Sequence, residues 1–191
     1  MTGFEAFADH ADNPSLQLME YLDASNHIKN LYCLKLPVIF QQAAAQLLEK
    51  IQLLQPDVVL CLGYAANRHV ISLERVAINL DDASIPDNMG QQPIDQSIIP
   101  HGQNAYFSSL PIKAIYQALK DEQIPCEISY SAGTYVCNHV FYHLMHMVHS
   151  SHSNITAGFI HIPAFSTAQL SLKQQCHALQ IIIKKCVETC L

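Results

Sequence analysis

The chain has 191 residues, of which half are hydrophobic and 14% are charged, so it suits one domain with a buried core and is too apolar for disorder. Its net charge of −6 and its lack of a lysine or arginine run argue against a nucleic-acid surface. No apolar run reaches the roughly 20 residues that a membrane helix needs. Seven cysteines without a C-x-x-C pair predict a reducing, cytoplasmic location.

The first half of the chain alternates short apolar runs with segments of helical period. Apolar residues at helical spacing follow Asn13-Pro14-Ser15, and Ser15 is predicted to cap this helix. The run D-V-V-L-C-L-G is apolar on both faces, as in a buried parallel strand. The predicted elements are a helix after Ser15, a strand at 31–37, a helix at 40–54, a strand at 57–63 and a partly exposed strand at 71–80.

The second half continues the alternation after a polar loop from Asp81 to about Gly102. The predicted elements are a helix after Pro111, a strand at 126–132, a helix from Gly133 to about Ser150, a strand at 155–162 and a last helix from about Ser171. Buried strands alternating with helices predict the α/β class, with a mainly parallel sheet covered on both faces. In such sheets ligands bind beyond the carboxyl ends of the strands.

The stretch S-A-G-T-Y-V-C-N-H places Cys137 in the first turn of a predicted helix. On a helical wheel Cys137 falls on the same side as Val140 and Leu144, so its side chain is predicted to point inward. Unpaired backbone N–H groups and the helix dipole favour a thiolate there, and the same N–H groups offer donors for an oxyanion. The segment alone leaves two readings open, a nucleophile and a small apolar side chain packed in the core.

A thiolate enzyme also needs a base, which directs attention to the histidines. His161 stands near the carboxyl end of the buried run G-F-I-H-I-P, where an imidazole needs a partner. Glu74 is a carboxylate that could orient such an imidazole, although alone it is more typical of a surface ion pair. His139, His143 and His146 fall opposite the apolar stripe of their helix, which predicts solvent exposure rather than a metal site.

Six motifs extend across most of the chain in one order. They are T-G-F-E-A-F at 2–7, N-P-S at 13–15, E-R-V-A-I-N at 74–79, I-P-D-N-M-G at 85–90, S-A-G-T-Y-V-C-N-H at 131–139 and G-F-I-H-I-P at 158–163. In these motifs the chain resembles the pyrrolidone-carboxylate peptidases, or pyroglutamyl peptidases of type I. The resemblance implies a single three-layer α/β/α domain over residues 1–191, with a mixed, mainly parallel sheet. It also implies a homo-oligomer, a dimer or a tetramer.

The resemblance further implies a cysteine peptidase that removes N-terminal pyroglutamate from peptides and requires no metal or organic cofactor. The family's catalytic triad falls on Glu74, Cys137 and His161. A pyroglutamyl end carries neither a free amine nor a carboxylate, so its pocket needs flat apolar walls and no acidic group. The residues that the resemblance places around the lactam ring are Phe4, Phe7, Asn13, Ile85, Tyr135 and Val136.

Three departures from the family pattern lie near this expected site. The family has a short apolar strand directly before T-G-F, so that first strand is expected to be missing here. Tyr64 stands where glutamine is common, and Ser84 stands where arginine is common. These changes support a rival reading, an impaired relative that binds pyroglutamyl ends or serves as an oligomeric scaffold. A nucleoside phosphorylase would need a phosphate cradle, which the sequence lacks.

Overall fold

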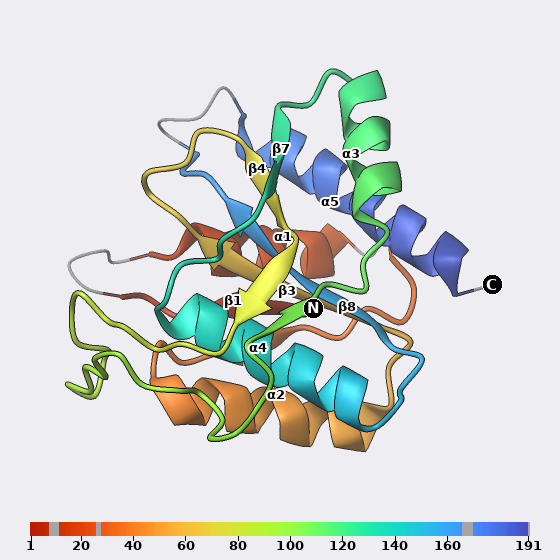
Figure 1. Ribbon diagram of the computed structural model, residues 1–191. Coiled ribbons are helices and arrows are strands. Elements are labelled where there is room, and N and C mark those ends of the chain that lie inside the picture. Colours follow the sequence, from red (N-terminus) through yellow and green to blue (C-terminus); the bar gives the residue numbers. More distant parts are fainter. Residues whose placement is uncertain (8–11, 26–27, 166–169, 191) are drawn as a thin grey trace.

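The structure, a computed structural model, describes residues 1–7, 12–25, 28–165 and 170–190. Through the middle of this described part runs a six-stranded sheet in the order β2-β1-β3-β8-β4-β7 (Figure 1). Neighbouring strands are parallel except for β4 and β8, so the sheet is mixed and mainly parallel, as predicted. The strands are β1 (Thr2–Phe4), β2 (Leu34–Leu36), β3 (Val58–Tyr64), β4 (Ile71–Glu74), β7 (Cys126–Ser129) and β8 (Thr156–Ile162).

Helices cover both faces of this sheet and give the molecule three layers (Figure 1). The helices α2 (Phe40–Leu54) and α4 (Val136–Ser150) pack on one face, and α1 (Pro14–Ser25), α3 (Ile112–Asp121) and α5 (Leu172–Thr189) pack on the other. Side chains of a strand alternate between the two cores. Cys61 and Phe159 join the core beneath α4, whereas Leu62 and Ile160 join the opposite one. Among the described helices, none has the length and apolar character to cross a membrane.

The first strand, expected to be missing, is present because Thr2–Phe4 itself forms it. This strand pairs in parallel with β2 along its length and meets β3 through Thr2 and Cys61. Beyond the strand, the N–H of Glu5 donates to the carbonyl of Leu36 at 2.9 Å. The T-G-F run therefore occupies the position between β2 and β3, and it carries Phe4 to the carboxyl edge of the sheet.

Helix α1 begins at Pro14, two residues earlier than predicted, and its cap differs. Oδ1 of Asn13 accepts a hydrogen bond from the N–H of Ser15 at 3.0 Å, so Asn13 is the capping residue. Ser15 is fully buried and accepts from the N–H of Phe4 at 3.0 Å through its hydroxyl oxygen. The N-P-S motif thus ties the start of α1 to the end of β1.

The single strand predicted at 71–80 is divided after Glu74. The N–H of Arg75 still donates to Ser129 of β7, but β5 (Val76–Ile78) then pairs antiparallel with β6 (Ala105–Phe107) in a separate two-stranded sheet. The side-chain amide of Asn138 in α4 exchanges two hydrogen bonds with the backbone of Ile78 and so fixes β5. Because the chain leaves the main sheet there, Glu74 is the last residue of β4.

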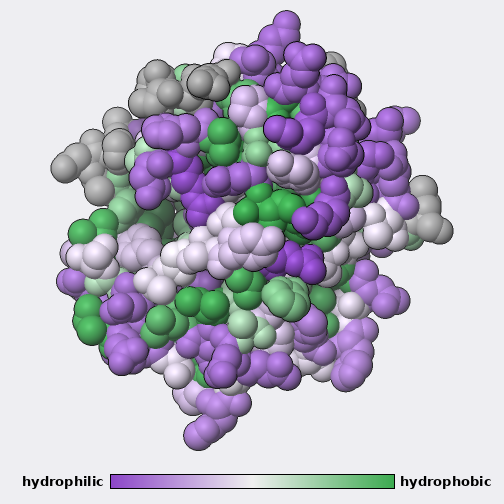
Figure 2. Space-filling view, turned by 45° about the horizontal axis from the view of Figure 1, so that its top comes forward, coloured by the Kyte–Doolittle hydropathy of each residue, from purple (hydrophilic) through white to green (hydrophobic). Residues whose placement is uncertain are grey.

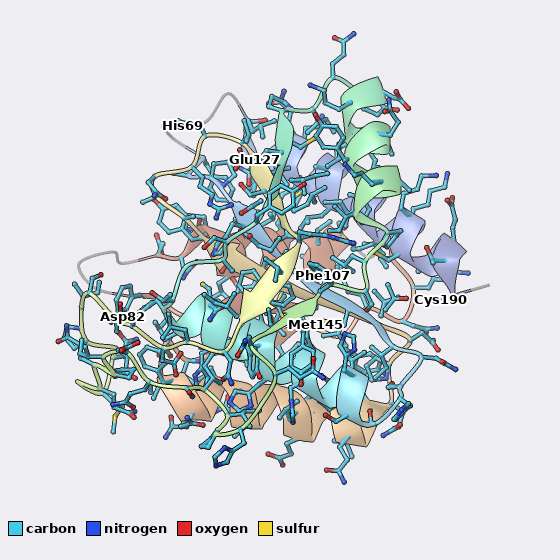
Figure 3. All side chains as sticks on the ribbon, in the orientation of Figure 1. His69, Asp82, Phe107, Glu127, Met145 and Cys190 are labelled. Atoms are coloured by element: carbon cyan, nitrogen blue, oxygen red, sulfur yellow. The ribbon has the colours of Figure 1, made fainter. Side chains whose placement is uncertain are left out.

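The surface shown in Figure 2 carries hydrophobic residues in small groups separated by hydrophilic ones. Phe107, labelled in Figure 3, is 62% exposed, and the guanidinium of Arg75 lies 5.0 Å from the centre of its ring. A cation–π pair of this kind gives Arg75 a local partner on the surface.

Candidate active site

Glu74 and His161 form a buried pair where β4 and β8 run antiparallel. Nδ1 of His161 lies 2.7 Å from Oε1 of Glu74, and the two side chains are 5% and 0% exposed. His161 is the register partner of Ser72, and Glu74, two residues further along β4, points to the same face of the sheet. An Nδ1–H donated to the carboxylate fixes the tautomer and leaves Nε2 to exchange a proton.

Cys137 lies over the same face of the sheet, in the first turn of α4 as predicted. Its Sγ lies 2.9 Å from the position that a Cβ on Gly63 would occupy. Gly63 is in turn the register partner of His161 on the neighbouring strand β3. The absence of a side chain at Gly63 therefore leaves the room in which the sulfur sits, and the structure gathers Cys137, His161 and Glu74 on one face at one end of the sheet.

The surroundings of Cys137 favour the protonated form of its thiol. Burial raises its pKa to about 12, the charges of Glu74 and Cys61 add to the increase, and the positive charge of Arg68 opposes it. Burial thus opposes the thiolate that the helix mouth favours. The proton has to leave as the sulfur attacks, and His161 is a base on the same face that can accept it.

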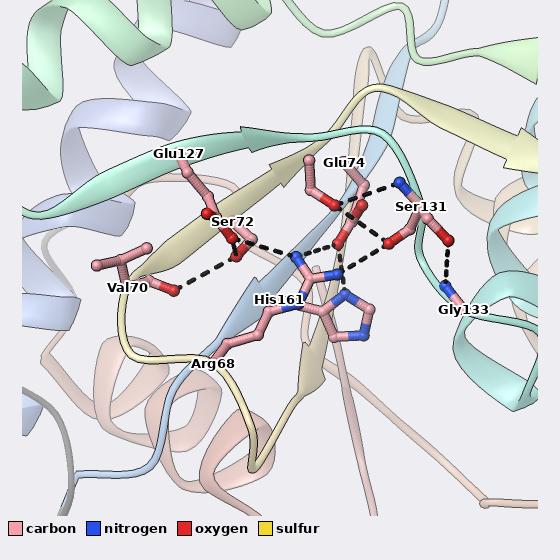
Figure 4. A network of polar contacts seen from close by, with 9 residues as sticks. Arg68, Val70, Ser72, Glu74, Glu127, Ser131, Gly133 and His161 are labelled. Carbon is pink, nitrogen blue, oxygen red and sulfur yellow. Dashed lines mark hydrogen bonds and ion pairs between the residues drawn. The ribbon is translucent and has the colours of Figure 1, made fainter.

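Arg68, which the sequence patterns did not single out, completes this network (Figure 4). Its Nη1 lies 2.8 Å from Oε1 of Glu74, the same oxygen that His161 contacts. Its Nη2 donates to the carbonyl of Ser131, also at 2.8 Å. Glu127 of β7, which Figure 3 shows on the same side of the molecule as His69, lies 3.7 Å from Nη1 of Arg68. Arg68 stands in an irregular loop between β3 and β4, where periodicity gives no signal.

A pocket of about 140 Å³ opens beside Cys137 at the carboxyl ends of β1 and β3, where the sheet rule predicts a site. Five residues that the resemblance placed around the lactam line it, whereas Ile85 is 46% exposed and does not. A larger cavity of about 270 Å³ lies between the loop after α3 and the start of α5, and no predicted site residue lines it. The residues that line the pocket beside Cys137 are Phe4, Phe7, Asp12, Asn13, Val38, Tyr64, Tyr135, Val136 and Cys137.

Two polar residues of this pocket differ from expectation. The carboxylate of Asp12 is part of the lining, although the sequence suggested no acidic group there. The side chain of Asn13 is occupied by the protein, since Oδ1 accepts from the N–H of Ser15 and Nδ2 donates to the carbonyl of Glu5 at 2.9 Å. Asn13 therefore builds the wall of the pocket and keeps little hydrogen-bonding capacity for a ligand.

The I-P-D-N-M-G segment holds the pocket together from outside. Nδ2 of Asn88 donates to Oε1 of Glu5 at 3.0 Å, and the N–H of Asn88 donates to the carbonyl of Val38 at 3.0 Å. The hydroxyl of Tyr135 donates to the carbonyl of Pro86 at 3.0 Å. This one segment thus connects the chain after β1, the chain after β2 and the residue before α4.

The histidines of α4 are not the exposed row that the helical wheel predicted. His139 is fully buried, and its Nδ1 lies 2.7 Å from Oδ2 of Asp81. Its ring meets that of Phe40 edge-on at 5.5 Å, because α2 covers this second face of α4. Burial, with the charges of His139 and His146, lowers the pKa of His143 to about 4. Within the described residues, no three acidic, histidine or cysteine side chains gather as metal ligands would.

Comparison with known proteins gives one family from sequence and from structure. The family model described as pyroglutamyl peptidase matches residues 1–189. Pyrrolidone-carboxylate peptidase 2 of Caldanaerobacter subterraneus subsp. tengcongensis is 42% identical over 198 residues, covering 100% of this chain and 96% of that protein. Pyrrolidone-carboxylate peptidase of Vibrio vulnificus is 44% identical, covering 99% and 92%.

Solved structures agree with the sequence relatives. Pyroglutamyl peptidase I from Bacillus amyloliquefaciens superimposes with a TM-score of 0.89 at 40% identity, covering 95% of this chain and 92% of that one. A mutant pyrrolidone carboxyl peptidase from Pyrococcus furiosus superimposes with a TM-score of 0.92 at 34% identity, covering 100% and 98%.

Proposed function

The chain belongs to the pyroglutamyl peptidase family and is a hydrolytic enzyme, and we propose that it removes N-terminal pyroglutamate from peptides through a thioester on Cys137. One observation carries this proposal. The sulfur of Cys137 lies at a small, largely apolar pocket and on the sheet face that bears the Glu74–His161 pair.

The pocket accounts for the proposed substrate. Its volume of about 140 Å³ is below the roughly 300–1,000 Å³ of sites for drug-sized ligands, so it suits a single small ring. Phe4, Phe7 and Tyr135 supply flat walls for an uncharged lactam, and Val136 borders Cys137. In the proposal the remaining expected residue, Ile85, acts from the rim, whereas Asn13 shapes the wall.

The proposed reaction has two halves. Sγ of Cys137 attacks the pyroglutamyl carbonyl carbon while Nε2 of His161 takes the thiol proton, and N–H groups of the first turn of α4 stabilise the oxyanion. His161 then gives that proton to the leaving amine as the C–N bond breaks, which leaves a thioester. Water attacks the thioester with His161 as base, the C–S bond breaks, and the sulfur regains a proton from His161 as pyroglutamate leaves.

Glu74 has a supporting part in both halves. Its contact with Nδ1 orients the imidazole, and its charge stabilises the imidazolium that forms each time His161 holds the extra proton. Because burial raises the pKa of the Cys137 thiol, the proposal needs this base at the moment of attack.

A test of the proposal uses release of a fluorophore from a pyroglutamyl amide in the presence of a reductant. We expect the wild type to release it and Cys137→Ser to be inactive. Cys190→Ser is the matched control, since Cys190 is exposed at the end of α5, and it should keep wild-type activity. Equal rates for wild type and Cys137→Ser would contradict the thioester route.

The second candidate is an impaired relative that binds pyroglutamyl ends, and Tyr64 supports it because this departure from the family pattern lines the pocket. Under that candidate the folded wild type binds a pyroglutamyl peptide in calorimetry and does not cleave it. The proposal also includes a cytoplasmic homo-oligomer, a dimer or a tetramer, for which light scattering on the purified protein is the test.

A further inference from the structure

The geometry around Glu74 points to Arg68 as a positioning residue of the active site, and this inference rests on the proposed function. We propose that the Arg68 guanidinium holds Glu74 in place for His161 and connects that pair to the segment that carries Cys137. Arg68 itself does not line the substrate pocket.

Glu74 depends on a single oxygen for its stabilisation. His161 Nδ1 hydrogen-bonds to Oε1 at 2.7 Å, and Arg68 Nη1 forms an ion pair with the same oxygen at 2.8 Å but has no hydrogen bond among the described residues. The other oxygen, Oε2, is buried and has no hydrogen-bond partner among the described residues. A fully buried carboxylate with one satisfied oxygen is costly to keep ionised unless a positive charge is close. Arg68 supplies that charge permanently, whereas His161 supplies it only when protonated.

The second amino group of the guanidinium reaches a different part of the site. Nη2 of Arg68 donates to the carbonyl of Ser131, six residues before the nucleophile (Figure 4). Arg68 therefore spans from β4 to the segment that leads into α4, which lysine, with its single ammonium, cannot do in the same way. A shift of this segment relative to His161 would change the approach of sulfur to the imidazole, and misplacement of about 1 Å costs about 100-fold in rate.

The charged groups around His161 determine how loss of Arg68 should change proton binding at the site. They come from Glu74 on β4, from Arg68 in the loop before β4 and from Cys137 on α4, with Glu127 of β7 beyond Arg68. Removing the positive charge of Arg68 raises the proton affinity of the Glu74–His161 pair, whichever member holds the proton. It also removes the one charge that lowers the pKa of the Cys137 thiol.

The experiment compares Arg68→Gln, Arg68→Lys and Arg75→Gln in the full chain. For Arg68→Gln we expect kcat to fall by about 100-fold with little change in KM, and the acidic limb of the kcat/KM profile to move up by about one pH unit. Arg68→Lys keeps the charge but cannot contact Glu74 and Ser131 at the same time. Its acidic limb should therefore lie at the wild-type pH, whereas its kcat should be only partly restored. Arg75→Gln is the matched control, because Arg75 pairs with Phe107 on the surface, and it should behave as wild type.

A readout that does not need peptidase activity separates this inference from the proposed function. The rate of iodoacetamide alkylation at Cys137 is followed on its tryptic peptide by mass spectrometry at several pH values. In Arg68→Gln the pH at which this rate rises should be higher than in the wild type. If that shift is present but no variant cleaves a pyroglutamyl amide, the positioning role stands and the proposed function fails.

A purely structural Arg68 gives a different pattern. In that case Arg68→Gln and Arg68→Lys would lose activity equally, with both pH limbs where the wild type has them, and the inference would be overturned. The inference also fails if Arg68→Gln does not fold and Arg68→Lys folds with wild-type kcat and wild-type limbs.

Discussion

Two buried imidazole–carboxylate pairs flank the start of α4, and they are nearly identical in geometry. His161 lies 2.7 Å from Glu74, and His139 lies 2.7 Å from Asp81. The surroundings differ, however, since the first pair shares its sheet face with the thiol of Cys137 and touches an arginine. The second is packed against the ring of Phe40. A short buried His–carboxylate contact is thus a common way to satisfy a core histidine, and only the neighbouring nucleophile and pocket give it a chemical use.

The same isosteric change in each pair should give the largest difference between the two pairs. Glu74→Gln is expected to lower kcat/KM by about 10³–10⁴-fold, because the imidazole loses its orienting charge. Asp81→Asn is expected to leave kcat of the folded protein within a few-fold and to cost about 3 kcal/mol of unfolding free energy, because a buried pair is broken. Kinetics on a pyroglutamyl amide and urea unfolding measure both. An Asp81→Asn enzyme that is stable but inactive would contradict the division of roles.

A methyl group at Gly63 should disturb the nucleophile beside the first pair and leave the second pair untouched. The added Cβ would lie 2.9 Å from Sγ of Cys137 and 2.7 Å from the ring of Phe159, both closer than normal contact. We expect Gly63→Ala to lower kcat by about 10- to 100-fold and to cost about 1–3 kcal/mol of stability. Wild-type kcat in Gly63→Ala would mean that the sulfur sits elsewhere during catalysis.

Acid should lower the stability of the region around the second pair, because the ring of His143 packs beside that of His139. Because the folded-state pKa of His143 is about 4 and the usual value is 6.5, the unfolded chain binds more protons between these values. The contribution of neutral His143 is therefore complete above about pH 6.5 and is lost as the pH falls toward 4. This loss amounts to about 3 kcal/mol at most. Urea unfolding of wild type and His143→Gln at several pH values should show a shallower acid slope in the variant, and equal slopes would refute the assignment.

The smallest expected effect tests the one acidic residue of the substrate pocket. Asp12 is exposed at the pocket, and an uncharged lactam gains little from a carboxylate there. Asp12→Asn should therefore change KM for a pyroglutamyl amide by less than about threefold. A much larger rise in KM would indicate that the pocket binds a cationic amino terminus instead.

The fold and the central site residues could be predicted from the sequence for physical reasons. Apolar runs of strand length alternate with helical periods, so the layered α/β arrangement follows from burial alone. The sheet rule then draws attention to the carboxyl end of β8, where His161 stands, and to the first turn of the helix that carries Cys137. The expected first-strand gap was wrong because T-G-F, although short, makes the parallel contacts itself.

The remaining features depend on contacts that no local pattern encodes. A helical wheel orders the faces of α4 relative to one another, but it cannot show that α2 covers the second face and buries His139. Arg68 lies in an aperiodic loop, and its partners are six and 63 positions away along the chain. The division after Glu74 is set by the pairing of β5 with β6, which is a tertiary contact rather than a propensity.

Because the substrate pocket depends on the contacts of Asn88, it can lose its order before the sheet unfolds. Segments distant in sequence meet around the pocket, and hydrogen bonds from one loop join them to each other. Such polar contacts open locally at lower free energy than a packed core unfolds. Catalysis should consequently disappear at a urea concentration that leaves the far-ultraviolet circular dichroism of the sheet and helices intact. Inactivation would then report the order of a loop, and not the survival of the fold.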